Sequence, residues 1–187
     1  LTDAQRAEVR RRVEAGATFV WVYGPDIVGP DGADPARVEA LTGIPVEARF
    51  DDTPLVFECP GSGEVVDVDL RQWVEGRWRP RFVVPERDGV DVLARYRDTG
   101  ETAVAVRQAG AGRHAYAALP GLPVSMLRDL CARAGVHLYW DGAGTTAVAG
   151  EYLMVHTPAE ERYSFTWAGK VSGVRRVFPG PERDTGR

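Results

Sequence analysis

The chain has 187 residues, of which 44% are hydrophobic and 27% charged, an ordinary composition for a globular protein with a buried core. This composition excludes a disordered, collagen-like or coiled-coil protein, and no stretch approaches the ~20 apolar residues of a membrane-spanning helix. The net charge of −4 argues against an electrostatic nucleic-acid binder. Two cysteines are too few for a disulfide framework, so we expect a reduced, cytoplasmic compartment and neither a nucleic-acid nor a membrane partner.

The N-terminal part of the chain predicts a helix, a strand and a second helix. Thr2 and Gln5 form a capping-box pattern, and Gly16 is placed to end the helix that they begin. The run 18–23 is β-branched and aromatic throughout, which is typical of a strand covered on both faces in a parallel sheet. Asp34 followed by Pro35 predicts the start of a short helix.

The middle of the chain predicts strands, because short apolar runs alternate with proline and glycine. The sequence Asp98-Thr99-Gly100 predicts a hairpin turn. Pro123 begins the strongest predicted helix, and Gly135 is placed to end it. The expected strands are 46–50, 55–58, 65–70, 81–84, 92–96, 103–107 and 113–119, followed after the helix by 137–140 and 152–156.

The C-terminal part predicts a small β appendage. Residues 163–167 and 174–178 are expected to form a closing pair of strands, and 179–187 to form a loose tail because almost nothing in them is apolar. Taken in order, these elements predict an α/β domain over 1–157 and a small antiparallel β-strand appendage over 158–178.

Reactive side chains are not grouped along the sequence. Cys131 lies on the apolar stripe of its predicted helix, as a core residue would. Cys59 stands at a strand end with no histidine near it in sequence to activate a thiol. The three histidines, His114, His137 and His156, lack the spacings that commonly build a zinc site. We therefore expect no catalytic residue, no metal and no cofactor.

One arginine–aromatic cluster stands out. It can stack on a sugar or a base, but tryptophan and arginine are also enriched at protein interfaces. Because the chain has no basic surplus, an interface is the favoured interpretation. The candidate residues are Trp73, Arg77, Trp78, Arg79 and Arg81, with Trp140 as a further stacking platform and Trp21 as a further interface residue.

Several segments, taken in order, resemble one family. Residues 2–32 (TDAQRAEVRRRVEAGATFVWVYGPDIVGPDG) look like the helix–strand–loop segment in the middle domain of trimeric β-galactosidase-type glycoside hydrolases. The segments that continue the resemblance are LTGI (41–44), LARYRDTG (93–100), AVAVR (103–107), PVSMLRDLCARAGVHLY (123–139) and AVAGEYLMVH (147–156), the last leading into a small β-domain.

The resemblance implies a flavodoxin-like, class I glutamine-amidotransferase-like layered sheet whose first strands precede Leu1. In such relatives the catalytic carboxylates lie on a separate (β/α)₈ barrel, N-terminal to this region and too large for 187 residues. The implied partners are therefore other copies of the chain, as in a trimer, and a barrel of the same parent chain.

The resemblance also implies that this segment has lost amidotransferase chemistry. True amidotransferases present a cysteine on the sharp turn after a strand. The matching position here is Tyr23-Gly24-Pro25, which offers no thiol. The expected function is a non-catalytic assembly domain, and the alternatives are a carbohydrate-binding accessory domain or a stand-alone hydrolase that uses Cys59 or a carboxylate pair.

Overall fold

The structure, a computed structural model, describes residues 1–59, 63–67, 79–140, 142, 144–157, 164–176 and 183–184. The chain divides into two compact units, Leu1–Leu130 and Cys131–Arg187, and each is described by itself. The domain boundary that the sequence predicts at residue 157 is a different kind of division from this one, which reflects compactness alone. The boundary at residue 157 stays a prediction.

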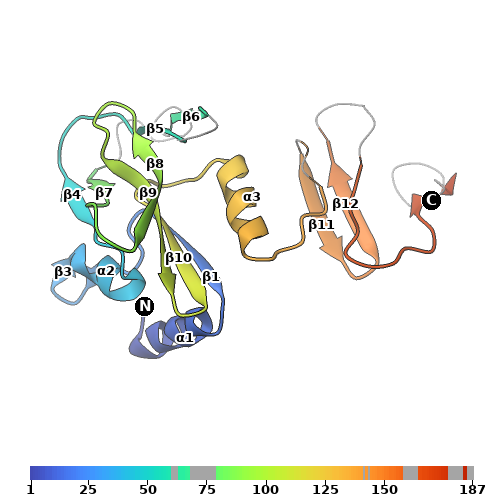
Figure 1. The fold of residues 1–187 in the computed structure, drawn as a ribbon, viewed down its shortest axis with the longest axis horizontal. Helices are drawn as coiled ribbons and strands as arrows, with labels where there is room; N and C mark the ends of the chain where they lie inside the picture. The colour runs from blue at the N-terminus through green and yellow to red at the C-terminus, as the bar shows by residue number, and fades with distance from the viewer. Residues whose placement is uncertain are drawn as a thin grey trace. The chain divides into compact units, whose positions relative to one another are not determined.

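The first unit is built on a six-stranded sheet in the order β1-β10-β9-β8-β5-β6 (Figure 1). β1 and β10 pair in parallel, and the other pairs in this sheet are antiparallel. Two short antiparallel pairs, β2 with β3 and β4 with β7, complete the strands of this unit that the structure describes. The bounds are β1 (Thr18–Val22), β2 (Val28–Gly29), β3 (Gly32–Ala33), β4 (Glu47–Arg49), β5 (Val56–Glu58), β6 (Val65–Asp67), β7 (Arg81–Val83), β8 (Val90–Tyr96), β9 (Thr102–Ala109) and β10 (Gly112–Ala117).

The α/β flavodoxin-like, class I glutamine-amidotransferase-like fold expected from the sequence is wrong. That fold requires parallel strands joined by crossover helices. Here β8, β9 and β10 follow one another through tight turns, which force neighbouring strands to run antiparallel. Gly100 and Gly110 adopt the positive φ values, 69° and 62°, that these two turns require.

The expectation that the strand at 18–23 is covered on both faces is also wrong. β1 lies at the edge of the sheet rather than in its centre. Val20 and Val22 are 36% and 46% exposed, so the strand is not covered on both faces. A short apolar run has the same composition in both positions, and periodicity does not distinguish between them.

Helix α1 (Asp3–Glu14) begins at the expected capping box. The Gln5 backbone N–H donates to Thr2 Oγ1 at 3.3 Å, and the Thr2 N–H donates to Gln5 Oε1 at 2.8 Å. Val9 and Val13 are buried on the face of α1 that packs against Phe19, Trp21 and Leu41. The helix therefore covers one face of β1.

Helix α2 (Ala36–Thr42) also follows its predicted signals. The Ala36 N–H donates to Asp34 Oδ1 at 2.9 Å, and Gly43 ends the helix with a left-handed φ of 70°. Helix α3 (Val124–Arg133) starts directly after Pro123, as predicted.

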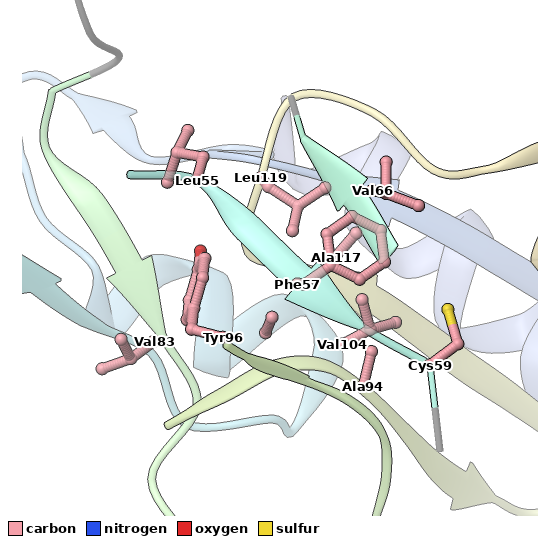
Figure 2. Close-up of a cluster of buried hydrophobic side chains, with 11 residues drawn as sticks. Leu55, Phe57, Cys59, Val66, Val83, Ala94, Tyr96, Val104, Ala117 and Leu119 are labelled. Carbon is pink, nitrogen blue, oxygen red and sulfur yellow. The ribbon is translucent and has the colours of Figure 1, made fainter. Parts of the chain in front are cut away.

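The core of the first unit lies on both faces of the sheet. Figure 2 shows the larger cluster, in which Phe57 of β5 lies at the centre and is fully buried. The residues of this cluster are Leu55, Phe57, Cys59, Val66, Val83, Ala94, Tyr96, Ala103, Val104, Ala117 and Leu119. The second cluster comprises Val38, Ile44, Val46, Phe82, Val84, Ala105, Tyr116 and Ala118.

The second unit contains a hairpin of β11 (Thr145–Ala149) and β12 (Tyr152–His156), together with the short pair β13 (Arg175–Arg176) and β14 (Arg183–Asp184). The strand expected at 137–140 and the closing pair of 163–167 with 174–178 are wrong. The Thr166 N–H instead donates to Tyr139 O at 2.8 Å, and the Thr166 carbonyl accepts from His137 Nε2 at 2.7 Å. The partner of β13 lies in the segment expected to be a loose tail.

Across the described ranges, no helix is both long and apolar enough to cross a membrane.

Candidate functional site

The strand end at which the resemblance puts a nucleophile is occupied by Tyr23, whose φ of 60° is left-handed. Its backbone N–H donates to Ala117 O at 2.8 Å, and its carbonyl accepts from the Tyr116 hydroxyl at 2.5 Å. Its hydroxyl donates to Pro80 O at 2.7 Å. A residue other than glycine keeps such a backbone only where its surroundings hold it, and these three bonds do so.

The chemistry of Tyr23 is that of a structural residue. Burial raises the pKa of its hydroxyl, although the nearby Arg79 charge opposes this shift. The phenol is therefore neutral at pH 7 and its proton is held by a carbonyl oxygen, which makes it a poor nucleophile.

The residues that follow Tyr23 tie the strand end to two helices. Gly24 and Pro25 form a half-buried turn that leads to Asp26. The Asp26 carboxylate is 1% exposed, and its Oδ2 lies 2.8 Å from Nε of Arg6 on α1. Arg37 on α2 donates to the Asp26 carbonyl at 3.0 Å. The turn thus serves the packing of the first unit.

A charged network surrounds Arg81, whose side chain is only 2% exposed. Its Nε and Nη2 donate to the two carboxylate oxygens of Asp51 at 3.2 and 2.7 Å, and its Nη1 donates to Glu101 at 2.8 Å. The guanidinium carbon lies 4.9 Å from the centre of the Tyr96 ring. Two carboxylates and one aromatic face therefore satisfy the charge of Arg81 inside the protein.

The network reaches the surface through β4. Arg49 Nε donates to Glu101 at 3.2 Å, and Arg49 Nη2 lies 2.7 Å from Glu47. On the buried side, two carbonyl oxygens lie within hydrogen-bond distance of the Tyr96 hydroxyl: that of Phe82 at 2.9 Å and that of Ala118 at 3.1 Å. These hydrogen bonds and ion pairs hold the side chains of the network in place. Its charged groups are directed at one another and not toward a substrate.

The network predicts acid sensitivity. Hydrogen bonds from Arg81 hold the pKa of Asp51 well below its ordinary value of 3.8, against an opposing effect of burial. A depressed pKa contributes stability that is complete above the ordinary value and is lost as the pH falls through the folded-state value. We expect urea unfolding at pH 5 to 2 to show a falling free energy of unfolding, with a smaller fall in Asp51→Asn. Equal falls in both proteins would contradict this assignment.

The other arginine–aromatic candidates lie in different places. Arg79 forms an ion pair with Asp52, whose carboxylate is almost fully exposed. Trp140 is 9% exposed and packs against Phe165, with 5.7 Å between the ring centres. Trp73, Arg77 and Trp78 lie outside the described residues.

A glycine-rich turn covers Trp140. A methyl group added at Gly142 would approach the Trp140 ring to 2.3 Å, and one added at Gly144 would approach it to 2.9 Å. The described part of the turn therefore packs directly on the indole.

Neither cysteine has the setting of an activated nucleophile. Cys59 is buried in the core, and burial raises the pKa of its thiol, with the charges of Glu64 and Glu58 adding to the shift. Cys131 is half-buried within α3. In neither residue does a helix N-terminus stabilise a thiolate.

The histidines are dispersed. Trp21 Nε1 donates to His114 Nδ1 at 3.0 Å, and burial, followed by the Arg107 charge, lowers the pKa of His114. His137 bonds to a backbone oxygen, and His156 is exposed on β12. No three His, Cys, Asp or Glu side chains gather into a metal-binding group within the described ranges.

Comparisons with known proteins find similar solved structures but no similar sequence. No protein-family model matches the chain, and no curated protein matches its sequence. The β-galactosidase of Bacillus circulans sp. alkalophilus is similar in structure, with a TM-score of 0.55 and 19% identity over 94% of this chain and 28% of that one. The GH42 β-galactosidase Gan42B of G. stearothermophilus gives a TM-score of 0.54 and 13% identity over 84% and 23%.

The cold-adapted β-galactosidase of Rahnella sp. R3 is also similar, with a TM-score of 0.50 and 18% identity over 79% of this chain and 24% of that one. The chain shares its fold with part of these β-galactosidases. It spans about a quarter of the length of the enzymes that it matches.

The sequence did not reveal the partners of Arg81. Asp51 and Glu101 lie in separate loops, 30 and 20 residues from Arg81 in the chain. Neither forms a helical or strand-spaced pair with it, so no local pattern joins the three. The only available signal was an arginine at the start of an apolar strand, a position where a charge requires a buried partner.

Proposed function

We propose that the chain is a non-catalytic assembly domain of a glycoside-hydrolase-like protein. The fold is shared with part of several β-galactosidases, and the chain spans only about a quarter of their length. The resemblance in the sequence adds two partners to this proposal: a catalytic barrel of the same parent chain and further copies of the domain, as in a trimer.

The similarity in fold to part of several β-galactosidases carries the proposal. Tyr23, at the end of β1, has its hydroxyl, carbonyl and amide all hydrogen-bonded within the first unit. The nearby charged groups are paired among themselves around Arg81. Among the described residues, the polar groups around this strand end therefore serve packing.

Exposed apolar side chains of the first unit support an assembly role. Phe50 is 81% exposed beside the Arg81 network, and Val20 and Val22 are exposed on the edge strand β1. Exposed large apolar side chains of this kind are typical of surfaces that become buried on association. The carbohydrate-binding alternative depends on Trp73 and Trp78, because Trp140 is covered.

Two measurements on the purified chain test the proposal. We expect no hydrolysis of a nitrophenyl β-galactoside above the buffer rate, and a weight-average mass in sedimentation that rises with protein concentration. Hydrolysis that disappears in Cys59→Ala would support the stand-alone hydrolase instead. A monomer at every concentration would contradict the assembly role.

A further inference from the structure

A side-chain hydrogen bond ties the edge strand β1 to its neighbour β10. Trp21 Nε1 donates to His114 Nδ1 at 3.0 Å, between residues that are 93 positions apart in the chain. β1 pairs with β10 on one side, and among the described residues no strand pairs with it on the other. The attachment of β1 to the sheet therefore depends on its contacts with β10, of which this bond is one.

The hydrogen bond fixes the protonation state of His114. A ring nitrogen that accepts from an N–H carries no proton of its own, so the neutral imidazole holds its proton on Nε2. A proton gained in acid must therefore go to Nδ1, where it points at the Trp21 N–H. Two donors then face each other, and the hydrogen bond is lost.

The surroundings of His114 on the helix side are apolar. Its side chain is 3% exposed, and the rings of Phe19 and Trp21 lie beside it, with 6.4 and 6.2 Å between ring centres. Three side chains of α1 and α2 pack against these two rings, and none of them titrates: Val9, Val13 and Leu41. The neighbours from β1 and the two helices in this cluster therefore carry no charge that could balance an imidazolium.

The charge that acts on His114 from within the described residues is itself positive. Arg107 lies opposite His114 in the pairing of β9 with β10. Its guanidinium occupies the space beside Gly43, at the end of α2, where a side chain would otherwise lie. Burial, followed by this charge, lowers the pKa of His114 from its ordinary value of 6.5. The folded protein therefore favours the neutral imidazole.

We propose that His114 is a pH-sensitive switch, whose protonation in mildly acidic solution breaks the bond to Trp21 and opens the pairing of β1 with β10. In the open junction the imidazole reaches water and regains its ordinary affinity for protons. The stability of the closed junction is therefore complete above pH 6.5 and falls as the pH drops from 6.5 through the folded-state value. The switch lies within one chain, so it does not depend on the proposed assembly function.

Hydrogen exchange at two pH values tests the switch. Two backbone amides report on the junction: the Tyr23 N–H, bonded to Ala117 O, and the Arg113 N–H, bonded to Ala17 O. Protection factors correct for the intrinsic effect of pH on exchange. We expect those of both amides to fall about twofold to tenfold between pH 7.5 and 5.5, and the ordinary pKa of 6.5 sets the upper limit.

A third amide distinguishes opening of the junction from unfolding of the whole unit. The Ala118 N–H bonds to Ala103 O on the other side of β10. Because the switch opens β1 and leaves the β8–β9–β10 meander closed, this amide should be better protected at pH 5.5 than those of Tyr23 and Arg113. Equal protection of all three amides would overturn the switch.

Two substitutions separate the proton from the hydrogen bond. His114→Asn keeps an oxygen near the position of Nδ1 that accepts from Trp21 but gains no proton in this range, so its protection factors should be equal at the two pH values. Trp21→Phe removes the donor, and the pKa of His114, followed by NMR, should rise because protonation no longer breaks a bond. His156→Asn, at an exposed position on β12, is the matched control and should behave as the wild type.

The outcomes decide between the switch and a purely structural imidazole. A fall in protection that persists in His114→Asn would overturn the switch, because the fall would then not come from His114. Circular dichroism checks that each variant folds. If His114→Asn does not fold, the titration of Trp21→Phe decides, and a pKa of His114 unchanged from the wild type would reject the coupling between the proton and the bond.

Discussion

Phe57→Ala is expected to lower the free energy of unfolding of the first unit by about 3–5 kcal/mol. The side chain is fully buried, and Figure 2 shows it among the other side chains of the larger core cluster. Its neighbours lie on strands fixed by hydrogen bonds, so they cannot collapse into the space that the ring leaves. Urea denaturation followed by tryptophan fluorescence measures the loss.

Phe50→Ala is the matched control for this prediction. It removes the same ring from a position 81% exposed and only seven residues away, and it should leave the free energy of unfolding nearly unchanged. Equal effects of the two substitutions would mean that Phe57 is not in the core described here.

Asp51→Ala is expected to cost about 2–3 kcal/mol, although Asp51 itself is partly exposed. The cost arises at Arg81, whose side chain is 2% exposed and which, among the described residues, would keep Glu101 as its one carboxylate partner. Removing one partner of a buried ion pair destabilises a protein strongly, because the remaining charge is then poorly compensated in the interior. Thermal or urea unfolding at pH 7 measures the loss.

Asp52→Ala is the control for Asp51→Ala. The Asp52 carboxylate is 96% exposed and pairs with Arg79 in water, where such a pair contributes little. The neighbouring aspartates should therefore differ sharply. If Asp52→Ala destabilised the protein as much as Asp51→Ala, the stability of the network would not depend on the burial of Arg81.

Local elements were predictable because their signals are local. The capping box of Thr2 and Gln5, the proline that precedes α3 and the positive-φ Gly100 each act over a few residues, and all three are found as predicted. The order of the strands is not local. Nothing in the run 18–23 shows that its neighbour is β10, almost a hundred residues away, or that it lies at an edge.

The candidate site was only partly predictable for the same reason. The resemblance gave Tyr23-Gly24-Pro25 the place of a lost nucleophile, but the fold that defines such a place is wrong here, and the groups that bond Tyr23 belong to Pro80, Tyr116 and Ala117. Arg81 was predicted to face a partner or a sugar because it sits in an arginine–aromatic cluster. Its side chain instead turns inward to Asp51 and Glu101, and only three-dimensional proximity brings these groups together.

The parallel pairing of β1 with β10 has a consequence for how the chain folds. The β8–β9–β10 meander closes through two short loops, whereas β1 must wait for a contact across 93 residues, the distance between Trp21 and His114. Contacts of such high sequence separation form late, because loop closure costs entropy before they are made. During synthesis, β1 would leave the ribosome well before β10 and pair with it only after the meander forms, so a change in Trp21 fluorescence on contact with His114 would report this late docking step.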